Sequence, residues 1–218
     1  MTDRASFLAA IRSTPRGTDP GLLDRQSAPD APTQLRVGED RCERLQAEAE
    51  ATDTVVHRVQ ESAVAATVVG ILVGVGAQTI ALTADLEPFA EAIRVATGAA
   101  GLDVGDYGEI APNRAQTGAL DATVTGCLAA VAASGSIVTS AAGAGRAGAL
   151  IAPTHICVVR DDQIVGGLHE LFDGDALTGA GSLFALQSGP SRSADIEKVL
   201  ILGVHGPGNV QLVIVAPD

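Results

Sequence analysis

The stretch that decides the fold class is Thr54–Thr97, TVVHRVQESAVAATVVGILVGVGAQTIALTADLEPFAEAIRVAT. Short strand-like segments alternate there with longer segments whose apolar residues recur at helical spacing. The predicted elements are a strand at Thr54–Val59, a helix at Glu61–Gly74, a strand at Gln78–Leu82 and a helix at Glu87–Thr97. This alternation predicts an α/β domain with a mainly parallel, covered sheet.

Upstream of this stretch, the pattern over Glu39–Ala51 is helical, and the globular domain begins about there. Ser6–Arg12 is predicted to form a short amphipathic helix. Thr14–Pro32 contains four prolines and has no clear periodicity, which predicts an extended arm. We therefore divide the chain into an N-terminal helix and arm, residues 1–38, and an α/β domain, residues 39–218.

Downstream, shorter apolar runs continue the alternation after a loop-rich region at Leu102–Gly118. The predicted elements are a strand at Asp121–Cys127, a helical turn at Leu128–Ala132, a strand at Ser136–Ser140, a strand at Ile156–Arg160 and a helix at Val165–Phe172. A last apolar run follows Gly208 and closes the domain.

Composition narrows the class of function. The chain has 218 residues, of which 46% are hydrophobic and only 2% aromatic, so the core consists mainly of aliphatic side chains. With 14 Lys and Arg against 26 Asp and Glu, the net charge is −12. This charge repels a phosphate backbone, and few rings are available to stack on bases, so nucleic-acid binding is not expected.

Several cofactor and membrane signals are missing. Cys42, Cys127 and Cys157 form no CxxC pair, which argues against an iron–sulfur cluster or structural zinc on this chain. Cys127 and Cys157 lie in apolar runs, so we expect these two to be buried, reduced thiols. The glycines of GVGAQ lack the spacing of a dinucleotide fingerprint. The uncharged stretches Ser62–Ala84 and Ala122–Gly145 are interrupted by polar residues and glycine, so we expect buried elements rather than membrane spans. No secretory signal is recognisable, and we expect a cytoplasmic protein.

The polar groups of a possible site are concentrated in Gln187–Gly208, QSGPSRSADIEKVLILGVHGPG. Gly189 and Pro190 predict a sharp turn, and a helix is expected to begin at Ser191 or Ser193. The free N–H groups and positive end of such a helix attract anions, and Arg192 adds a full charge. Alternatively, Ser193 caps the helix and the acidic residues that follow only complement its dipole.

Other polar residues are expected near the same edge of the sheet, because ligands of parallel sheets lie at the carboxyl ends of the strands. The candidates are Ser136 and Arg146. Arg146 lies in a glycine-rich loop, and either it binds an anion or the loop is only a flexible turn. His155 opens a strand and is either a structural histidine or a ligand. His205 is the candidate for proton transfer, with Asp195 to orient it. His57 carries no functional signal.

Two strings carry a resemblance to a known family. They are SGSIVTSAAGAGRAGALIAPTHICVV, from Ser134, and QSGPSRSADIEKVLILGVHGPGNVQLVIV, from Gln187. Both are similar to the LUD domain, the family of lactate-utilization protein C, and the resemblance extends over roughly residues 40 to 216. The second string is the more specific, since GPSRSADIE followed by GVHGP at this spacing is rare.

The resemblance implies the fold of ribose-5-phosphate isomerase A and the CoA transferases, an α/β sheet with helices on both faces. It also implies a role beside two partner subunits that carry iron–sulfur clusters and oxidise L-lactate to pyruvate. The chain departs from the family at Ala133, where members often carry the glutamate of a Glu-Ser-Gly-Thr motif. This departure disfavours covalent catalysis from that position, whereas the changes to Ser193 and Ala152 are mild.

Three functions follow as hypotheses. The chain is an accessory subunit of a lactate-oxidising complex that binds a small organic anion or its partners. Alternatively, it is an independent enzyme of the CoA-transferase-like fold that acts on a phosphorylated or CoA-linked small molecule. In the third hypothesis it is only a scaffold, and the proline-rich arm is its functional part.

Overall fold

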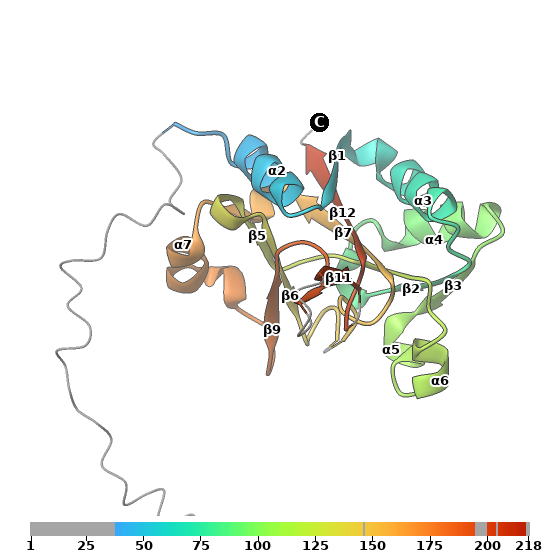
Figure 1. The fold of residues 1–218 in the computed structure, drawn as a ribbon. Coiled ribbons are helices and arrows are strands. Elements are labelled where there is room, and N and C mark those ends of the chain that lie inside the picture. Colours follow the sequence, from blue (N-terminus) through green and yellow to red (C-terminus); the bar gives the residue numbers. More distant parts are fainter. Residues whose placement is uncertain (1–37, 146, 195–199, 204, 217–218) are drawn as a thin grey trace, which may run out of the picture. The chain divides into compact units, whose positions relative to one another are not determined.

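The computed structural model describes residues 38–145, 147–194, 200–203 and 205–216. The predicted helix Ser6–Arg12 and the arm Thr14–Pro32 lie outside these residues, so the proposed division of the chain after residue 38 stays a prediction. The described part consists of a six-stranded sheet, a four-stranded sheet and a two-stranded ribbon, together with the helices that pack on them (Figure 1).

The main sheet is parallel throughout. Its strands, in spatial order, are β1 (Val55–Gln60), β12 (Asn209–Ala216), β7 (Thr154–Arg160), β4 (Ala122–Thr125), β2 (Thr79–Leu82) and β3 (Asp103–Asp106). The central strands β12 and β7 are buried over nearly their whole length. Continuous apolar runs such as that of β12 are typical of strands covered on both faces.

Alternate residues of these strands face two different hydrophobic layers, as the two-residue period of a strand requires. On β12, Val213 and Val215 belong to the cluster that contains α3 (Val64–Gly74) and α4 (Ala90–Ala99). Leu212 and Ile214 belong to the cluster formed by α2 (Arg41–Ala51) and the second sheet. Figure 1 shows these two layers on opposite sides of the main sheet, and the predicted fold class is confirmed. The finer likeness to CoA transferases stays a prediction.

The second sheet has the order β8 (Ile164–Val165), β5 (Ala129–Val131), β6 (Ser136–Ser140) and β9 (Phe184–Gln187). Its outer face is covered by α7 (Leu168–Asp173), whose Leu171 is completely buried against Val131 and Val138. Its inner face lies against the main sheet and contributes Ala130 and Ile137 to the α2 cluster. Polar residues of β9 and β7 therefore lie between two sheets.

The remaining elements are short. The helices α5 and α6 span Tyr107–Ile110 and Arg114–Thr117, and 3₁₀ turns occupy Glu61–Ala63, Ala84–Leu86, Ala132–Ser134, Asp161–Gln163 and Asp175–Leu177. The helix predicted at Glu39–Ala51 begins after Asp40, whose carboxylate accepts a hydrogen bond from the Glu43 amide at 2.8 Å. Such an N-cap typically stabilises a helix by about 1 kcal/mol.

Three element predictions are wrong in type or extent. Leu128–Ala132, predicted as a helical turn, is largely strand β5, because pairing with β6 overrides the helical propensity of its alanines. The region Leu102–Gly118, predicted as loops, contains β3, an edge strand with two aspartates and a glycine that gives little strand signal. The helix predicted from Val165 begins only at Leu168, because β8 occupies the first residues.

The helix predicted from Ser191 or Ser193 is also wrong. Arg192–Ala194 is a strand, β10, that pairs antiparallel with β11 (Leu200–Leu202). The amide of Gly203 donates to the carbonyl oxygen of Ser191 at 2.9 Å, and Gly203 has a φ of 75°, which glycine adopts easily. These contacts favour a two-stranded ribbon, so the helix N-terminus expected to attract an anion is not formed there.

The three cysteines are free and buried, as the sequence predicted for Cys127 and Cys157. Burial and a hydrogen bond from Cys42 to Asp161 raise the pKa of the Cys42 thiol to about 12. The neighbouring Cys157 thiol and burial raise the pKa of Cys127 well above its ordinary value. All three side chains belong to the cluster between α2 and the sheets. None of the described helices is both long and apolar enough to cross a membrane.

Candidate functional site

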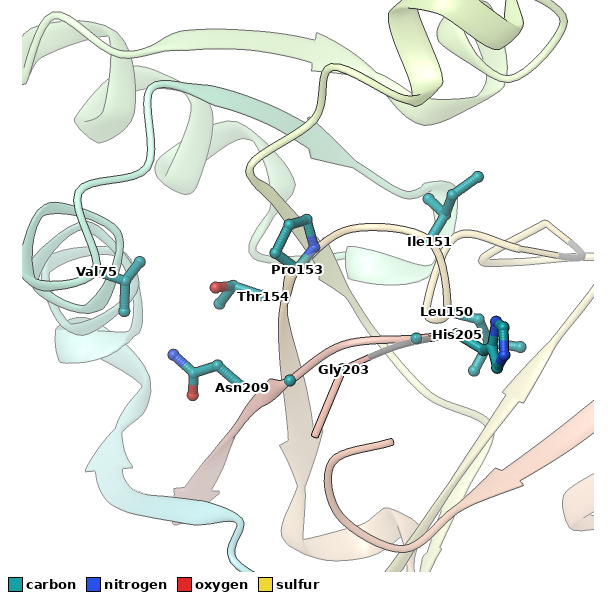
Figure 2. A pocket seen from close by; sticks show the side chains of 10 residues that line it. Val75, Leu150, Ile151, Pro153, Thr154, Gly203, His205 and Asn209 are labelled. Atoms are coloured by element: carbon teal, nitrogen blue, oxygen red, sulfur yellow. The ribbon is translucent and has the colours of Figure 1, made fainter. Parts of the chain in front are cut away.

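A cavity of about 580 Å³ opens at the amino ends of β7 and β12. Its lining comprises Val75, Leu150, Ile151, Pro153, Thr154, Gly203, His205, Gly206, Gly208 and Asn209. Figure 2 shows Val75, Thr154 and Asn209 toward one end of this cavity and Leu150 and His205 toward the other. The volume lies within the range of about 300–1,000 Å³ that is usual for small-molecule sites.

Two chain segments form the cavity wall and are joined through their backbones. The amides of Gly208 and Asn209 both donate to the carbonyl oxygen of Pro153, at 3.0 and 3.2 Å. The amide of Ser191 donates to the carbonyl oxygen of Pro207 at 2.8 Å. The turn from Gly203 to Gly208 is thus fixed on one side to the start of β7 and on the other to the segment that leads into β10.

The predicted site residues do not gather at the carboxyl ends of the strands, which corrects the sequence-based placement. Gly189 lies against Thr52, which precedes β1, so its turn is at the amino edge of the main sheet. Gly143, in the loop that contains Arg146, lies against Asp85, which follows β2 at the opposite edge. The Gly189 turn and this part of the loop therefore do not face one another. Arg146 itself and Asp195 lie outside the described residues.

The Gly189 turn requires glycine. Gly189 has a φ of 82°, and a Cβ atom there would lie 2.3 Å from the carbonyl oxygen of Thr52. Next to it, Ser188 Oγ lies 2.6 Å from Ser136 Oγ, which in turn lies 2.8 Å from Ser134 Oγ. The structure thus brings Gly189 and Ser136 together beside α2. It places Ser191 separately, against Gly206 in the cavity wall.

Arg192 forms an ion pair with Asp53. Both side chains are substantially exposed, at 40% and 66%, and Asp53 has a positive φ of 65°. The charge of Arg192 is therefore compensated within the chain, and Arg192 is not among the residues that line the cavity. Ser193 lies in β10 with its backbone paired to Ile201.

Replacing Arg192 by alanine is expected to have little effect. Exposed ion pairs contribute only about 0–1 kcal/mol, so the free energy of unfolding should fall by less than about 1 kcal/mol. Urea unfolding of wild type and Arg192→Ala checks this, with Arg160→Ala as the matched control because Arg160 also pairs with an exposed aspartate. A loss of several kcal/mol specific to Arg192→Ala would contradict the assignment of a surface role.

His155 is completely buried between the two sheets. Its Nε2 atom lies 2.9 Å from Thr125 Oγ1, and Gln187 of β9 lies beside the ring. Burial lowers the pKa of His155 to about 4, an effect that the neighbouring Gln187 side chain partly opposes. The ring is neutral near pH 7, and His155 is not among the residues that line the cavity. The structure therefore favours a structural role for His155 over a role as a ligand.

His205 is the one predicted proton-transfer residue that the structure describes, and it lies exposed at the cavity. Thr154 and Asn209 also line the cavity but were not predicted. Each is the first residue of a parallel strand, and a polar residue at that position indicates a possible contact at the amino edge. Among the described residues, no group of three His, Cys, Asp or Glu side chains is placed to bind a metal ion.

Known proteins share this fold and parts of this sequence. A crystal structure of a DUF162 family protein from Deinococcus radiodurans superimposes with a TM-score of 0.61 at 24% identity, covering 80% of this chain and 96% of that chain. Lactate utilization protein C of the same organism is 41% identical over 98 residues, which is 44% of this chain and 46% of that protein.

An uncharacterized protein of Neisseria meningitidis serogroup B is 29% identical over 102 residues, 45% of this chain and 44% of that protein. The chain thus matches less than half the length of each curated relative. The match to the family as a whole is far longer, since it runs over residues 42–215 and includes both sheets and the cavity wall. The chain belongs to the LUD domain family.

Proposed function

We propose that this chain is a non-redox subunit of a cytoplasmic system that oxidises L-lactate to pyruvate, with iron–sulfur clusters on partner subunits. Its similarity to lactate utilization protein C and its membership of the LUD domain family support this role. In the proposal, the chain binds a small organic acid in the cavity at the amino ends of β7 and β12.

The observation that carries the proposed binding role is the character of the cavity. The described residues of its lining supply hydroxyl, amide and imidazole groups but no carboxylate, although the chain as a whole has a net charge of −12. An organic acid is repelled less there than at the acidic surface. Ala133 is buried, at 4% exposure, and supplies no nucleophile where family members often carry glutamate, so binding is better supported than covalent catalysis.

The isolated chain is expected not to oxidise L-lactate. Incubation of the purified full chain with L-lactate and a soluble electron acceptor should give no pyruvate above a buffer control, because we place the redox centres on partners. If cysteine-rich subunits are encoded beside this chain, lactate oxidation should appear on co-expression with them, and these subunits should co-purify with it. Turnover by the isolated chain would refute the division of labour, and so would an active complex that forms equally well without this chain.

A second candidate function is favoured by the size of the cavity. About 580 Å³ is more space than lactate or pyruvate fills, and it suits a ligand of the size of a nucleotide or part of a CoA thioester. The chain would then be an independent enzyme acting on a phosphorylated or CoA-linked small molecule. Thermal unfolding with acetyl-CoA, ATP and ribose 5-phosphate tests this alternative, and an unchanged melting temperature with all three counts against it.

A further inference from the structure

One end of the cavity is connected to a chain of polar side chains on β1 and β12. His57 Nε2 lies 2.9 Å from Gln211 Oε1, and Gln211 Nε2 donates to Asn209 Oδ1 at 2.7 Å. Gln211 is buried, at 7% exposure, and stands opposite Val55 in the parallel pairing of the two strands. His57 and Asn209 are half-buried. The three residues form a continuous relay that ends at the cavity.

In the structure, each amide of this relay has a defined direction. The carbonyl oxygen of Gln211 accepts from His57, so its amino group must face Asn209. The carbonyl oxygen of Asn209 accepts that hydrogen bond, which leaves its Nδ2 amino group as the group available to a ligand. Because the amide oxygen of Asn209 is turned to Gln211, the two hydrogens of its amino group are the ones that can reach a ligand in the cavity.

We propose that Asn209 Nδ2 and the Thr154 hydroxyl recognise a carbonyl or carboxylate oxygen of the ligand, and that Gln211 and His57 are positioning residues that keep Asn209 in its donor orientation. Asn209 and Thr154 lie at the same end of the cavity in Figure 2 and are brought together by the pairing of β12 with β7. The choice of an organic acid as ligand rests on the proposed function. The recognition of an acceptor oxygen rests on the relay.

The arrangement selects against cationic and amine ligands at this end. An ammonium group carries only donor hydrogens, so it cannot pair with the Asn209 amino group and is bound less well there than an acceptor oxygen. Neutral groups can also donate hydrogen bonds to a carboxylate where no arginine is present, although the affinity is then modest. The rest of the cavity, toward Leu150 and His205, is free for the remainder of a ligand longer than lactate.

The experiment is an NMR titration of the full chain labelled with ¹⁵N, using pyruvate, L-lactate and ethylamine as probes. Side-chain NH₂ signals of Asn209 and Gln211, assigned from the Asn209→Asp and Gln211→Glu variants, should shift with pyruvate and lactate but not with ethylamine. Pyruvate has a ketone beside its carboxylate, and lactate has a hydroxyl in place of the ketone. Equal binding of the two acids would show that the carboxylate alone is recognised.

Asn209→Asp is isosteric and should weaken pyruvate binding about tenfold or more, because it replaces a donor to a charged oxygen by a carboxylate. Gln211→Glu should also weaken binding, because a carboxylate at 211 attracts the Asn209 amino group and turns its oxygen to the cavity. The matched control is Asn113→Asp, the same change at the N-cap of α6, outside the cavity lining. It should bind as wild type does.

His57→Gln and His57→Glu separate positioning from a structural role. The glutamine of His57→Gln can donate to Gln211, so this variant should retain wild-type affinity. The carboxylate of His57→Glu cannot donate, so this variant should bind as weakly as Gln211→Glu. Equal affinities in all variants overturn the inference, as does absence of binding by both pyruvate and lactate. If these acids bind while the Asn209 signals stay unmoved, the inference fails but the proposed organic-acid function stands. The proposed function is tested separately, by measuring whether the assembled complex loses lactate oxidation when this chain is left out.

Discussion

Replacing Gly126 by alanine is expected to lower the free energy of unfolding by about 3 kcal/mol. A Cβ atom at this position would lie 1.9 Å from the carbonyl oxygen of Asp85, which no real contact permits. The Gly126 amide also donates to Asp85 Oδ1 at 3.1 Å, so the backbones cannot separate without losing this hydrogen bond. Overpacking a tight site usually costs about 1–3 kcal/mol, and backbone displacement places this substitution at the upper end.

The matched control is the same substitution where space is available. Gly98 lies within α4 and has no positive φ, and a Cβ atom added there would meet no other atom within 4 Å. Gly98→Ala should raise the free energy of unfolding by about 0.5–1 kcal/mol, because alanine loses less backbone freedom than glycine in a helix. Urea unfolding of both variants gives the comparison. Wild-type stability of Gly126→Ala would show that β4 and the turn after β2 do not approach as closely as described.

Acidification is expected to destabilise the fold through His155 by about 3 kcal/mol. The pKa of this histidine is lowered by burial from 6.5 to about 4, so between these values the unfolded chain binds a proton that the folded chain does not. Stability therefore rises with pH through this window and is lost as the pH falls from about 6.5 to about 4. A difference of about 2.5 units at 1.36 kcal/mol per unit gives the stated magnitude.

Urea unfolding of wild type and His155→Asn at several values between pH 7 and pH 4 tests this prediction. Asparagine can hydrogen-bond to Thr125 but does not titrate, so its stability should decline less on acidification than that of wild type. The acidic residues titrate in both proteins and cancel in the difference. Parallel pH profiles would mean that His155 takes up its proton without unfolding.

The parallel core could be predicted because its pattern is simple. Over Thr54–Thr97 the strands and helices recur close to their expected positions, and the buried aliphatic side chains of α3 and α4 belong to one hydrophobic cluster. Prediction failed where tertiary pairing opposes local propensity. The alanines of Leu128–Ala132 indicate a helix, but Ala129–Val131 pairs as β5; Ser191 and Ser193 indicate a helix start, but Arg192–Ala194 pairs as β10.

The candidate site was predicted in part. Glycine and proline predict the turns at Gly189 and at His205–Gly208, and residues of the second turn do line the cavity. Their position was misjudged, although the sequence held the necessary signal, because a turn that precedes the last strand must lie at its amino end. The relay through Gln211 could not be predicted, since it depends on the adjacency of β1 and β12, the first and last strands of the sheet.

The three buried cysteines have a further consequence for how the chain behaves in a reducing or oxidising cell. Thiol–disulfide exchange and alkylation need an exposed thiolate, and the raised pKa values of Cys42 and Cys127 keep these sulfurs protonated at neutral pH. Cys157 is wholly shielded from solvent. We therefore expect these thiols to react slowly with glutathione and peroxide in the folded chain, and faster in molecules that have opened transiently.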